Sequence, residues 1–256
     1  MMKARTMNMR RCLCALLFGA ALQAVAGGSR DAVAFVCGHP DDLAGWSGTA
    51  LLLAERYDVH VIDYTHGERG LGEERYRDGS TRQLRTKEEE NVCAAIGATL
   101  HWMDEIDGEA CAPAATVEKM AALLREIRPK AVILHWPVDI HCDHMMSYAA
   151  AWRAILLAGL RGTTEVYFGE QSHQSRSFRP TVFVDISRVR KERDRIIAMY
   201  KCQWPDAMIE RKRNDAKFWG QRVQMDYVEA FAVADGTVKG PGILASLYRG
   251  KDAPAK

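Results

Sequence analysis

Two short polar clusters in this 256-residue chain carry the side chains that catalytic zinc sites use. The first, His39-Pro40-Asp41-Asp42, directly follows an apolar run, and the second, His141-Cys142-Asp143-His144, follows another apolar run about a hundred residues later. A catalytic zinc ion usually takes three His or carboxylate ligands and leaves one position open, whereas a structural zinc ion is closed by four ligands, mostly Cys. The two clusters therefore predict a three-ligand zinc site with a spare acid beside it.

The spacing within the first cluster suits this chemistry. His39 and Asp42 are three residues apart on a turn that enters a predicted helix, so both side chains can face one point. Asp41 lies between them and would project beside the metal, where a carboxylate can accept a proton. The alternative is that Asp41 or Asp42 only caps the helix that begins at Leu43, a common role for Asp.

The second cluster repeats the pattern. His141 and His144 are again three residues apart at the start of a predicted helix, and Asp143 can fix the tautomer of an imidazole from outside the metal site. The alternative makes Asp143 a plain helix cap and His141 a surface residue. Cys142 is expected to point away from the side that its neighbours share, so it is not predicted to be a ligand.

The apolar pattern alternates between strands and helices. Buried strands are predicted at residues 32–37, 59–64, 99–102, 131–135, 165–168 and 181–186. Helices are predicted at residues 46–56, 82–96, 116–127, 145–157 and 188–201, and residues 205–233 are predicted to be polar and helical, forming a lid, a dimer surface or simple packing. Since parallel strands need crossover connections, this alternation predicts an α/β domain with a mostly parallel sheet and helices on both faces.

The polar clusters all follow predicted strands. Residues 39–42 follow the first strand, 65–72 the second and 139–144 the fourth. Open α/β sheets bind their ligands at the carboxyl ends of the strands, which supports the metal site independently of the motifs. The glycines of the 65–72 segment do not follow the Gly-x-Gly-x-x-Gly order of nucleotide loops, so ordinary turn glycines are predicted.

Residues 1–26 resemble a secretory signal peptide. Basic residues precede an apolar stretch at 12–25 that is too short to span a membrane, and Ala24-Val25-Ala26 fits a signal-peptidase site. We expect a mature domain at 27–256, secreted or periplasmic, with no stable membrane span after processing. An uncleaved N-terminal anchor is the alternative.

Composition limits the possible partners. The leader carries four basic and no acidic residues, so its removal takes the formal net charge from +2 to −2, which argues against a nucleic-acid partner. The basic run 188–195 also contains Glu192 and Asp194 and is predicted to be a solvated helix face. Five cysteines remain, an odd number without the spacing of a disulfide framework, and Cys37 and Cys93 are predicted to be core residues.

A series of motifs resembles the PIG-L/LmbE-like zinc-dependent N-deacetylase family. Besides the two His/Asp clusters, the chain contains Thr65-His66-Gly67-Glu68-Arg69-Gly70, Arg85 with Glu88, Tyr200-Lys201-Cys202-Gln203 and Glu229-Ala230-Phe231. The two His/Asp motifs are the specific ones, and together the motifs span essentially the whole mature chain. The resemblance implies a single Rossmann-like domain that hydrolyses an N-acyl group, usually an acetyl group on a glucosamine-type sugar.

The resemblance also assigns roles to residues. It implies that His39, Asp42 and His144 hold Zn²⁺ and that Asp41 is the general base. His141 would polarise the carbonyl or protonate the leaving amine, and Asp143 would orient it. The chain departs from the family motif at Leu43, where Glu is usual, and at Cys142, where Pro is usual; neither position supplies a metal ligand.

Substrate contacts are less constrained by the sequence. Arg85 resembles a family position near the substrate, or it pairs with Glu88 one helical turn on. Trp136 immediately precedes the second cluster and is the best of three tryptophans for stacking on a sugar, with Trp204 and Trp219 as the others. A small-molecule or glycan substrate is expected, and the sequence leaves its identity and the oligomeric state open.

Two other classes of function are compatible with these residues. A thiol-conjugate amidase or a phosphoesterase could use the same metal centre, and a carbohydrate-binding relative could keep the fold without catalysis. The intact acid, histidine and three ligands argue against the relative without catalysis.

Overall fold

A computed structural model describes residues 30–172, 174–234, 236–238 and 240–247. The expected leader Met1–Ala26 lies outside these described residues. Among them, no helix combines the length and the apolar character that a membrane crossing requires.

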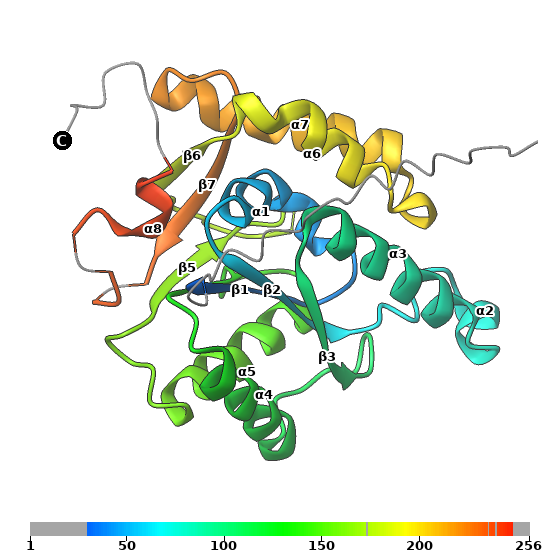
Figure 1. The fold of residues 1–256 in the computed structure, drawn as a ribbon. Helices are drawn as coiled ribbons and strands as arrows, with labels where there is room; N and C mark the ends of the chain where they lie inside the picture. Colours follow the sequence, from blue (N-terminus) through cyan, green and yellow to red (C-terminus); the bar gives the residue numbers. More distant parts are fainter. Residues whose placement is uncertain (1–29, 173, 235, 239, 248–256) are drawn as a thin grey trace, which may run out of the picture.

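Seven strands form one sheet in the order β3-β2-β1-β4-β5-β7-β6 (Figure 1). The strands are β1 Ala32–Cys37, β2 Asp58–Thr65, β3 Thr99–Glu105, β4 Ala131–His135, β5 Glu165–Gly169, β6 Val182–Asp185 and β7 Val228–Val233. The first five strands in chain order pair in parallel, and β7 pairs antiparallel with both β5 and β6. The prediction of a mostly parallel sheet in an α/β fold is confirmed.

Helices cover both faces of the sheet (Figure 1). They are α1 Ser47–Ala54, α2 Glu73–Arg77, α3 Ser80–Ile96, α4 Ala114–Ile127, α5 Cys142–Leu157, α6 Arg190–Ile197, α7 Pro205–Val223 and α8 Gly242–Ala245, with short 3-10 turns η1 Asp42–Gly45, η2 Ser187–Val189 and η3 Lys201–Gln203. Helices α4 and α5 lie on one face, and α1, α3, α6 and α7 lie on the other.

The side chains of β1 alternate between two apolar cores. Val33, Phe35 and Cys37 pack in the core beneath α1 and α6, while Ala34 and Val36 pack in the core beneath α4 and α5. Successive side chains of a strand point to opposite faces, so a central parallel strand must be apolar throughout. This requirement explains why the strand is already visible in the sequence as an uninterrupted apolar run.

The buried residues of helix α4 recur at the spacing of one helix face, and this face packs on the sheet. Val117, Met120, Ala121 and Leu124 are fully buried and follow the i, i+3, i+4, i+7 spacing of a single helix face. Complete burial of each of the larger side chains stabilises the fold by about 1.5–3 kcal/mol.

The segment 205–233 differs from its prediction. It contains helix α7, as expected, but after Val223 the chain turns and forms strand β7 between β5 and β6. The prediction of a helical stretch through Val233 is wrong because β7 is short and carries Glu229 in its apolar run, so its strand pattern is weak. The strand is defined by its pairing on both sides, which is a tertiary constraint.

Glu229 joins three elements inside the fold. Its carboxylate accepts hydrogen bonds from the backbone N–H groups of Gly48 (3.0 Å) and Thr49 (2.7 Å) at the start of α1. It also pairs with the guanidinium of Arg193 on α6 (2.9 Å), and both side chains are almost completely buried. A carboxylate at a helix N-terminus satisfies free N–H groups and favours the helix dipole. The pair therefore fixes α1, which follows directly on the first His/Asp cluster.

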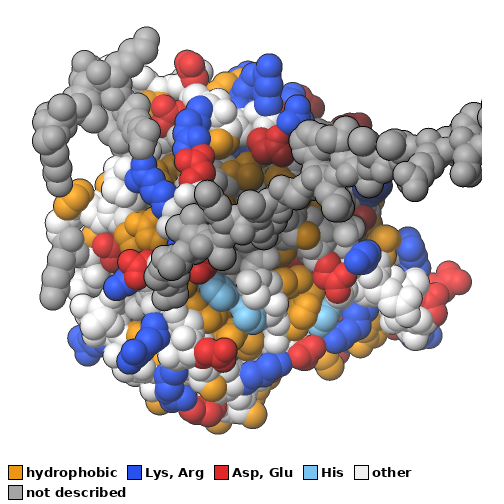
Figure 2. Space-filling model, viewed as in Figure 1, with side chains coloured by type: hydrophobic (Ala, Val, Ile, Leu, Met, Phe, Trp, Pro, Cys, Tyr) orange, Lys and Arg blue, Asp and Glu red, His pale blue; other side chains and the backbone are white. Residues whose placement is uncertain are grey.

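The visible charged side chains carry mixed signs. Figure 2 shows Lys and Arg interspersed with Asp and Glu over the face of the molecule that it presents. This mixture is consistent with the small net charge of the chain.

Replacing Glu229 with Ala should destabilise the fold strongly. Arg193 would then be a buried cation without its carboxylate, and we expect the free energy of unfolding to fall by about 3–5 kcal/mol in urea denaturation. The matched control is Glu192→Ala, which removes an exposed ion pair with Arg195 and should cost less than about 1 kcal/mol. Equal, small losses for both variants would contradict the structural role of Glu229.

Candidate metal centre

Strands β1 and β4 are neighbours at the centre of the sheet, and the chain leaves them in opposite directions. β2 and β3 continue the sheet beyond β1, while β5, β7 and β6 continue it beyond β4. Loops at such a switch point diverge and leave a crevice at the carboxyl ends of the strands. Both His/Asp clusters lie at this crevice, as their positions after β1 and β4 in the sequence predict.

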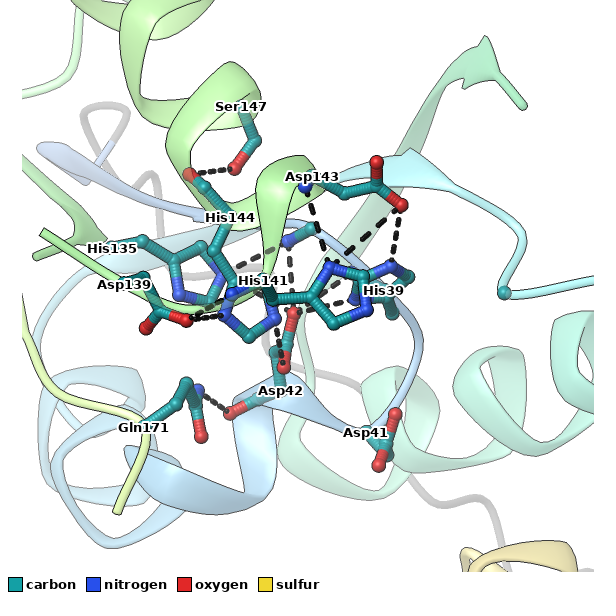
Figure 3. A network of polar contacts seen from close by, with 12 residues as sticks. His39, Asp41, Asp42, His135, Asp139, His141, Asp143, His144, Ser147 and Gln171 are labelled. Carbon is teal, nitrogen blue, oxygen red and sulfur yellow. Dashed lines mark hydrogen bonds and ion pairs between the residues drawn. The ribbon is translucent and has the colours of Figure 1, made fainter. Parts of the chain in front are cut away.

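Asp42 lies at the centre of the polar network (Figure 3). Its Oδ2 accepts hydrogen bonds from the backbone N–H groups of Gly38 (3.0 Å) and His39 (2.8 Å). The carboxylate therefore folds back over the loop that follows β1. Asp41 holds the N-cap position of η1, but its side chain makes no capping hydrogen bond. The capping role that the sequence allowed for these two acids is not what the structure shows.

Two predicted ligands face Asp42 from opposite loops. His39 Nδ1 lies 3.5 Å from Asp42 Oδ2, and His144 Nε2 lies 3.3 Å from Asp42 Oδ1. The structure thus brings His39, Asp42 and His144 together, although His39 and His144 are about a hundred residues apart in the chain.

The outer nitrogen of each imidazole meets a second carboxylate. His39 Nε2 lies 3.0 Å from Asp143 Oδ2, and His144 Nδ1 lies 3.3 Å from Asp139 Oδ1. Metal-bound histidines in proteins almost always have such an outer partner, which fixes the tautomer and the ring orientation. Each ring therefore presents its inner nitrogen to Asp42 and its outer nitrogen to an acid.

Electrostatics in the network reflect these pairs. Burial disfavours the charged form of His39, but hydrogen bonds to Asp107, Asp143 and Asp42 outweigh it and raise its pKa well above the usual value. For His144, burial is likewise outweighed, by Asp42 and by Asp139, and its pKa rises to about 9. Burial acts to raise the pKa of Asp42, yet the neighbouring histidines hold it well below the usual range. Protons on these rings are what a divalent cation would displace.

The donor set fits a divalent cation of the zinc type. His39, His141 and His144 offer ligand atoms within 4.8 Å of one another, and so do Asp42, His135 and His144. Imidazole nitrogens and carboxylate oxygens at such separations are the usual ligands of a catalytic zinc ion. The predicted ligand set His39, Asp42 and His144 combines members of these two groups, and both histidines lie within 3.5 Å of the Asp42 carboxylate.

His135 and Asp107 also belong to the network, although the sequence did not predict them as site residues. His135, the last residue of β4, is buried with Nε2 3.2 Å from Asp42 Oδ2, and burial lowers its pKa to about 4, so the ring is neutral. Asp107 follows β3 and lies 3.2 Å from His39 Nε2. The signal for Asp107 is its place at the carboxyl end of a strand, whereas His135 is hidden within an apolar run.

His141 and Asp143 have different nearest partners from the expected ones. The Asp143 carboxylate is 4.0 Å from His141 Nδ1 but 3.0 Å from His39 Nε2, and it accepts the N–H of Gly108 at 2.7 Å. His141 caps helix α5, because its Nδ1 accepts the backbone N–H of Asp143 at 3.3 Å. Asp143 therefore supports a candidate metal ligand more directly than it orients His141.

Asp41 stands beside the network (Figure 3), and its carboxylate pairs with the buried Arg85. The guanidinium of Arg85 donates to the Asp41 carboxylate and to the backbone carbonyls of Pro40 and Gly67, and it makes no ion pair with Glu88. Burial raises the pKa of Asp41, and the charge of Arg85 opposes that rise. Asp41 has φ 95°, a left-handed conformation that costs a non-glycine residue energy and often occurs at functional sites.

A cleft of about 510 Å³ opens over these groups. It is lined by His39, Asp41, Asp42, Asp107, His141 and His144, by Arg69, Gly70, Arg85 and Arg211, and by Gln174, Gln203, Trp204 and Met208. Trp136 is absent from this lining. Its indole donates to the carbonyl of Arg176 (2.8 Å) and its ring packs edge-on against Phe178. Trp204 is among the lining residues and is 72% exposed.

Gly38 allows the two loops to approach each other. A Cβ atom at this position would lie 2.8 Å from Cδ2 of His144 and 3.3 Å from Oδ2 of Asp42. Any side chain at Gly38 would push the second cluster away from the first.

Comparisons with known proteins agree with this geometry. Residues 34–155, which contain both clusters, match the family model described as PIG-L, GlcNAc-PI de-N-acetylase. The resemblance to the PIG-L family that the sequence motifs predict is confirmed over these residues.

Two curated relatives of this chain carry different activities in their names. It is 28% identical to 4-oxalmesaconate hydratase of Pseudomonas putida over 172 residues, which are 60% of this chain and 67% of the relative. It is 25% identical to diacetylchitobiose deacetylase of Thermococcus kodakarensis over 216 residues, which are 77% of this chain and 81% of the relative. These relatives are thus a hydratase and a deacetylase.

A solved structure shares the fold. The conserved protein TT1542 from Thermus thermophilus is 26% identical, with a TM-score of 0.68, over 82% of this chain and 97% of that one.

The two departures from the usual PIG-L motif leave the network intact. Leu43 is fully buried in the core beneath α1, so an apolar residue fits this position. Cys142 is exposed, and its Sγ lies 3.5 Å from Oδ1 of Asp143. Neither residue contacts His39 or His144 within the described part of the chain.

Zinc affinity should depend on Asp143, which contacts a candidate ligand, as well as on the candidate ligands themselves. We expect His144→Ala to abolish tight zinc binding, and Asp143→Asn to weaken the affinity by about 10- to 100-fold, because His39 would lose the nearer of the two carboxylates at its Nε2. Competition with a chromogenic chelator at fixed pH measures both effects. Asp58→Asn, at the exposed start of β2, is the control and should bind like the wild type. Tight binding by the His144 variant would show that the ligand set is misassigned.

Proposed function

We propose that this protein is a metal-dependent N-deacetylase that hydrolyses the acetyl amide of an amino sugar or glycoconjugate. The family match and the deacetylase among the relatives support this activity. The observation that carries it is the position of Asp41, a carboxylate that lines the cleft beside the candidate ligands without belonging to them. A catalytic site needs such a proton acceptor, whereas a metal-storage or structural site does not.

The metal would contribute Lewis acidity. When held by His39, Asp42 and His144, a divalent cation acts as a Lewis acid toward an acyl carbonyl and acidifies a water molecule near neutral pH. Side chains of the cleft would transfer protons and stabilise the oxyanion.

Asp41 is the proposed general base. Its carboxylate faces the cleft, and the charge of Arg85 favours its ionised form against the effect of burial. It accepts the proton of the attacking water, and the guanidinium limits how far the carboxylate can turn. Positioned proton transfer of this kind typically contributes 10²- to 10⁴-fold to a rate.

His141 is the proposed donor on the other side of the substrate. Because its Nδ1 accepts the N–H of Asp143, the proton of the neutral ring lies on Nε2. That N–H can stabilise the developing oxyanion. The departing amine, otherwise a poor leaving group, takes up the proton that Asp41 accepted from the water. Asp143 and Asp139 keep the two flanking rings in place.

Trp204 offers the apolar face that a pyranose ring can stack on. It is the first residue before α7, has φ 48° and exposes most of its indole at the mouth of the cleft. An exposed aromatic side chain in a strained backbone conformation is costly for stability alone. Trp204 therefore replaces Trp136 as the proposed sugar-stacking residue.

Hydration of an unsaturated carboxylate is the second candidate. The named activity of one relative is a hydratase, and three arginines, Arg69, Arg85 and Arg211, line the cleft. Two of them are already paired, Arg85 with Asp41 and Arg69 with Glu109, so the deacetylase remains the better proposal.

A substrate panel separates these possibilities. We expect release of free amine from N-acetylglucosamine or its β-linked dimer, loss of that activity with a chelator and its return with zinc. Acyl-cysteine conjugates, phosphate esters and 4-oxalmesaconate complete the panel. Turnover of one of these compounds alone would assign the protein to another class, and metal-free protein without turnover on any compound would favour a binding protein.

Asp41→Asn should separate metal binding from chemistry. Asn tolerates the left-handed conformation and leaves His39, Asp42 and His144 unchanged, so we expect stoichiometric zinc by elemental analysis. Turnover should fall by roughly 10²- to 10⁴-fold, because the amide cannot accept the proton. A variant with full activity would refute the assignment of the base.

A further inference from the structure

A small side pocket adjoins the candidate metal centre. It has a volume of about 60 Å³ and shares Asp41, Asp42, Gln174, Met208 and Arg211 with the main cleft. Its remaining lining residues are Gln171, Ser172 and Lys212. The pocket is therefore polar and reaches the position where the substrate would meet the metal.

Lys212 is an unusual residue for its position. The buried stripe of α7 consists of Met208, Lys212, Ala216 and Gly220, at helical spacing, and Lys212 is only 7% exposed. Lysine is almost never buried to this degree without a partner acid. No carboxylate oxygen of the described residues lies within ion-pair distance of its ammonium group.

Neutral groups hold the Lys212 ammonium instead. It donates to Gln171 Oε1 (2.9 Å) and to Ser172 Oγ (3.0 Å), and Ser172 in turn donates to Asp215. The amide of Gln171 also donates to the backbone carbonyl of Asp42 (2.8 Å). The buried cation is thus tied to the loop that carries the candidate ligands.

Arg211 adds a second cation to the same wall. It precedes Lys212 on α7 and is exposed at the junction of the pocket and the cleft. Within the described chain, its guanidinium has no hydrogen bond or ion pair, and the same is true of the side-chain amide of Gln174.

The acids of the pocket are already engaged. Asp42 faces His39, His135 and His144, and Asp41 is paired with Arg85. The hydrogen-bond donors left over are those of Arg211 and Gln174, with Lys212 behind them. An acetyl methyl group in this space would leave these donors without acceptors, which is unfavourable.

We propose that this side pocket binds a carboxylate group of the substrate, held by Arg211 and Gln174 against the positive charge of Lys212. The pocket has room for a group of a few heavy atoms and lies next to the proposed point of hydrolysis. Since the inference rests on the proposed deacetylase function, it narrows the substrate to N-acetylated amino sugars that carry an acid near the amide.

Binding without turnover tests the pocket independently of catalysis. Zinc-loaded Asp41→Asn protein is titrated calorimetrically with N-acetylglucosamine and with its 3-O-lactyl ether, N-acetylmuramic acid. We expect the acidic sugar to bind at least tenfold more tightly. Adding Arg211→Gln should reduce that preference about tenfold, the lower end of the range for a hydrogen bond between charged groups.

The control replaces a lysine on the same helix outside the cleft. Lys217→Gln removes one positive charge from an exposed position of α7, so it should leave the preference unchanged. Equal affinity for the two sugars, or an equal loss in the Arg211 and Lys217 variants, would overturn the proposal. Tighter binding of N-acetylglucosamine 6-phosphate than of the lactyl ether would overturn the carboxylate in favour of a phosphate.

Turnover distinguishes this failure from failure of the proposed function. Wild-type protein that hydrolyses neutral and acidic N-acetyl sugars equally well would be a deacetylase without an acid pocket. Protein that binds the acidic sugar selectively but releases no amine from either sugar would support the carboxylate pocket and contradict the proposed deacetylase activity.

Discussion

The candidate site depends on the Asp42 carboxylate. Two backbone N–H groups of its own loop hold one oxygen in place, and three imidazoles converge on the group, from the loop after β1, the end of β4 and the start of α5. In a buried environment this arrangement is stable only while the charges remain matched, since an unpaired buried carboxylate is costly. The positions of both loops, of Gly38 between them and of the outer acids follow from this requirement.

The network also links the site to the rest of the fold. Gln171, after β5, contacts the Asp42 carbonyl and the ammonium of Lys212. Arg193 donates to the backbone carbonyl of Lys212 (3.2 Å) and pairs with Glu229, which holds the start of α1. Helix α7 and the antiparallel edge of the sheet therefore support the cleft from behind, although they contribute none of the candidate ligands.

The sequence predicts those parts of the molecule that depend on the pattern of neighbouring residues in the chain. Strands β1 and β4 have the predicted bounds, because a central parallel strand is apolar on both faces. The meeting of His39, Asp42 and His144 also follows from strand order and spacing. By contrast, β7 depends on pairing with strands far away in the chain, and His135 looks like part of an apolar run. Which acid approaches which imidazole depends on how two loops pack, which explains why Asp143 meets His39.

The left-handed backbone at Asp41 has a consequence for evolution. Glycine or asparagine would relax this residue, so selection for stability alone would remove the acid. An aspartate in this strained conformation costs stability, and in return the direction in which its carboxylate faces the cleft is fixed. Descendants that lost the activity would be expected to lose this aspartate early, well before the histidines around it.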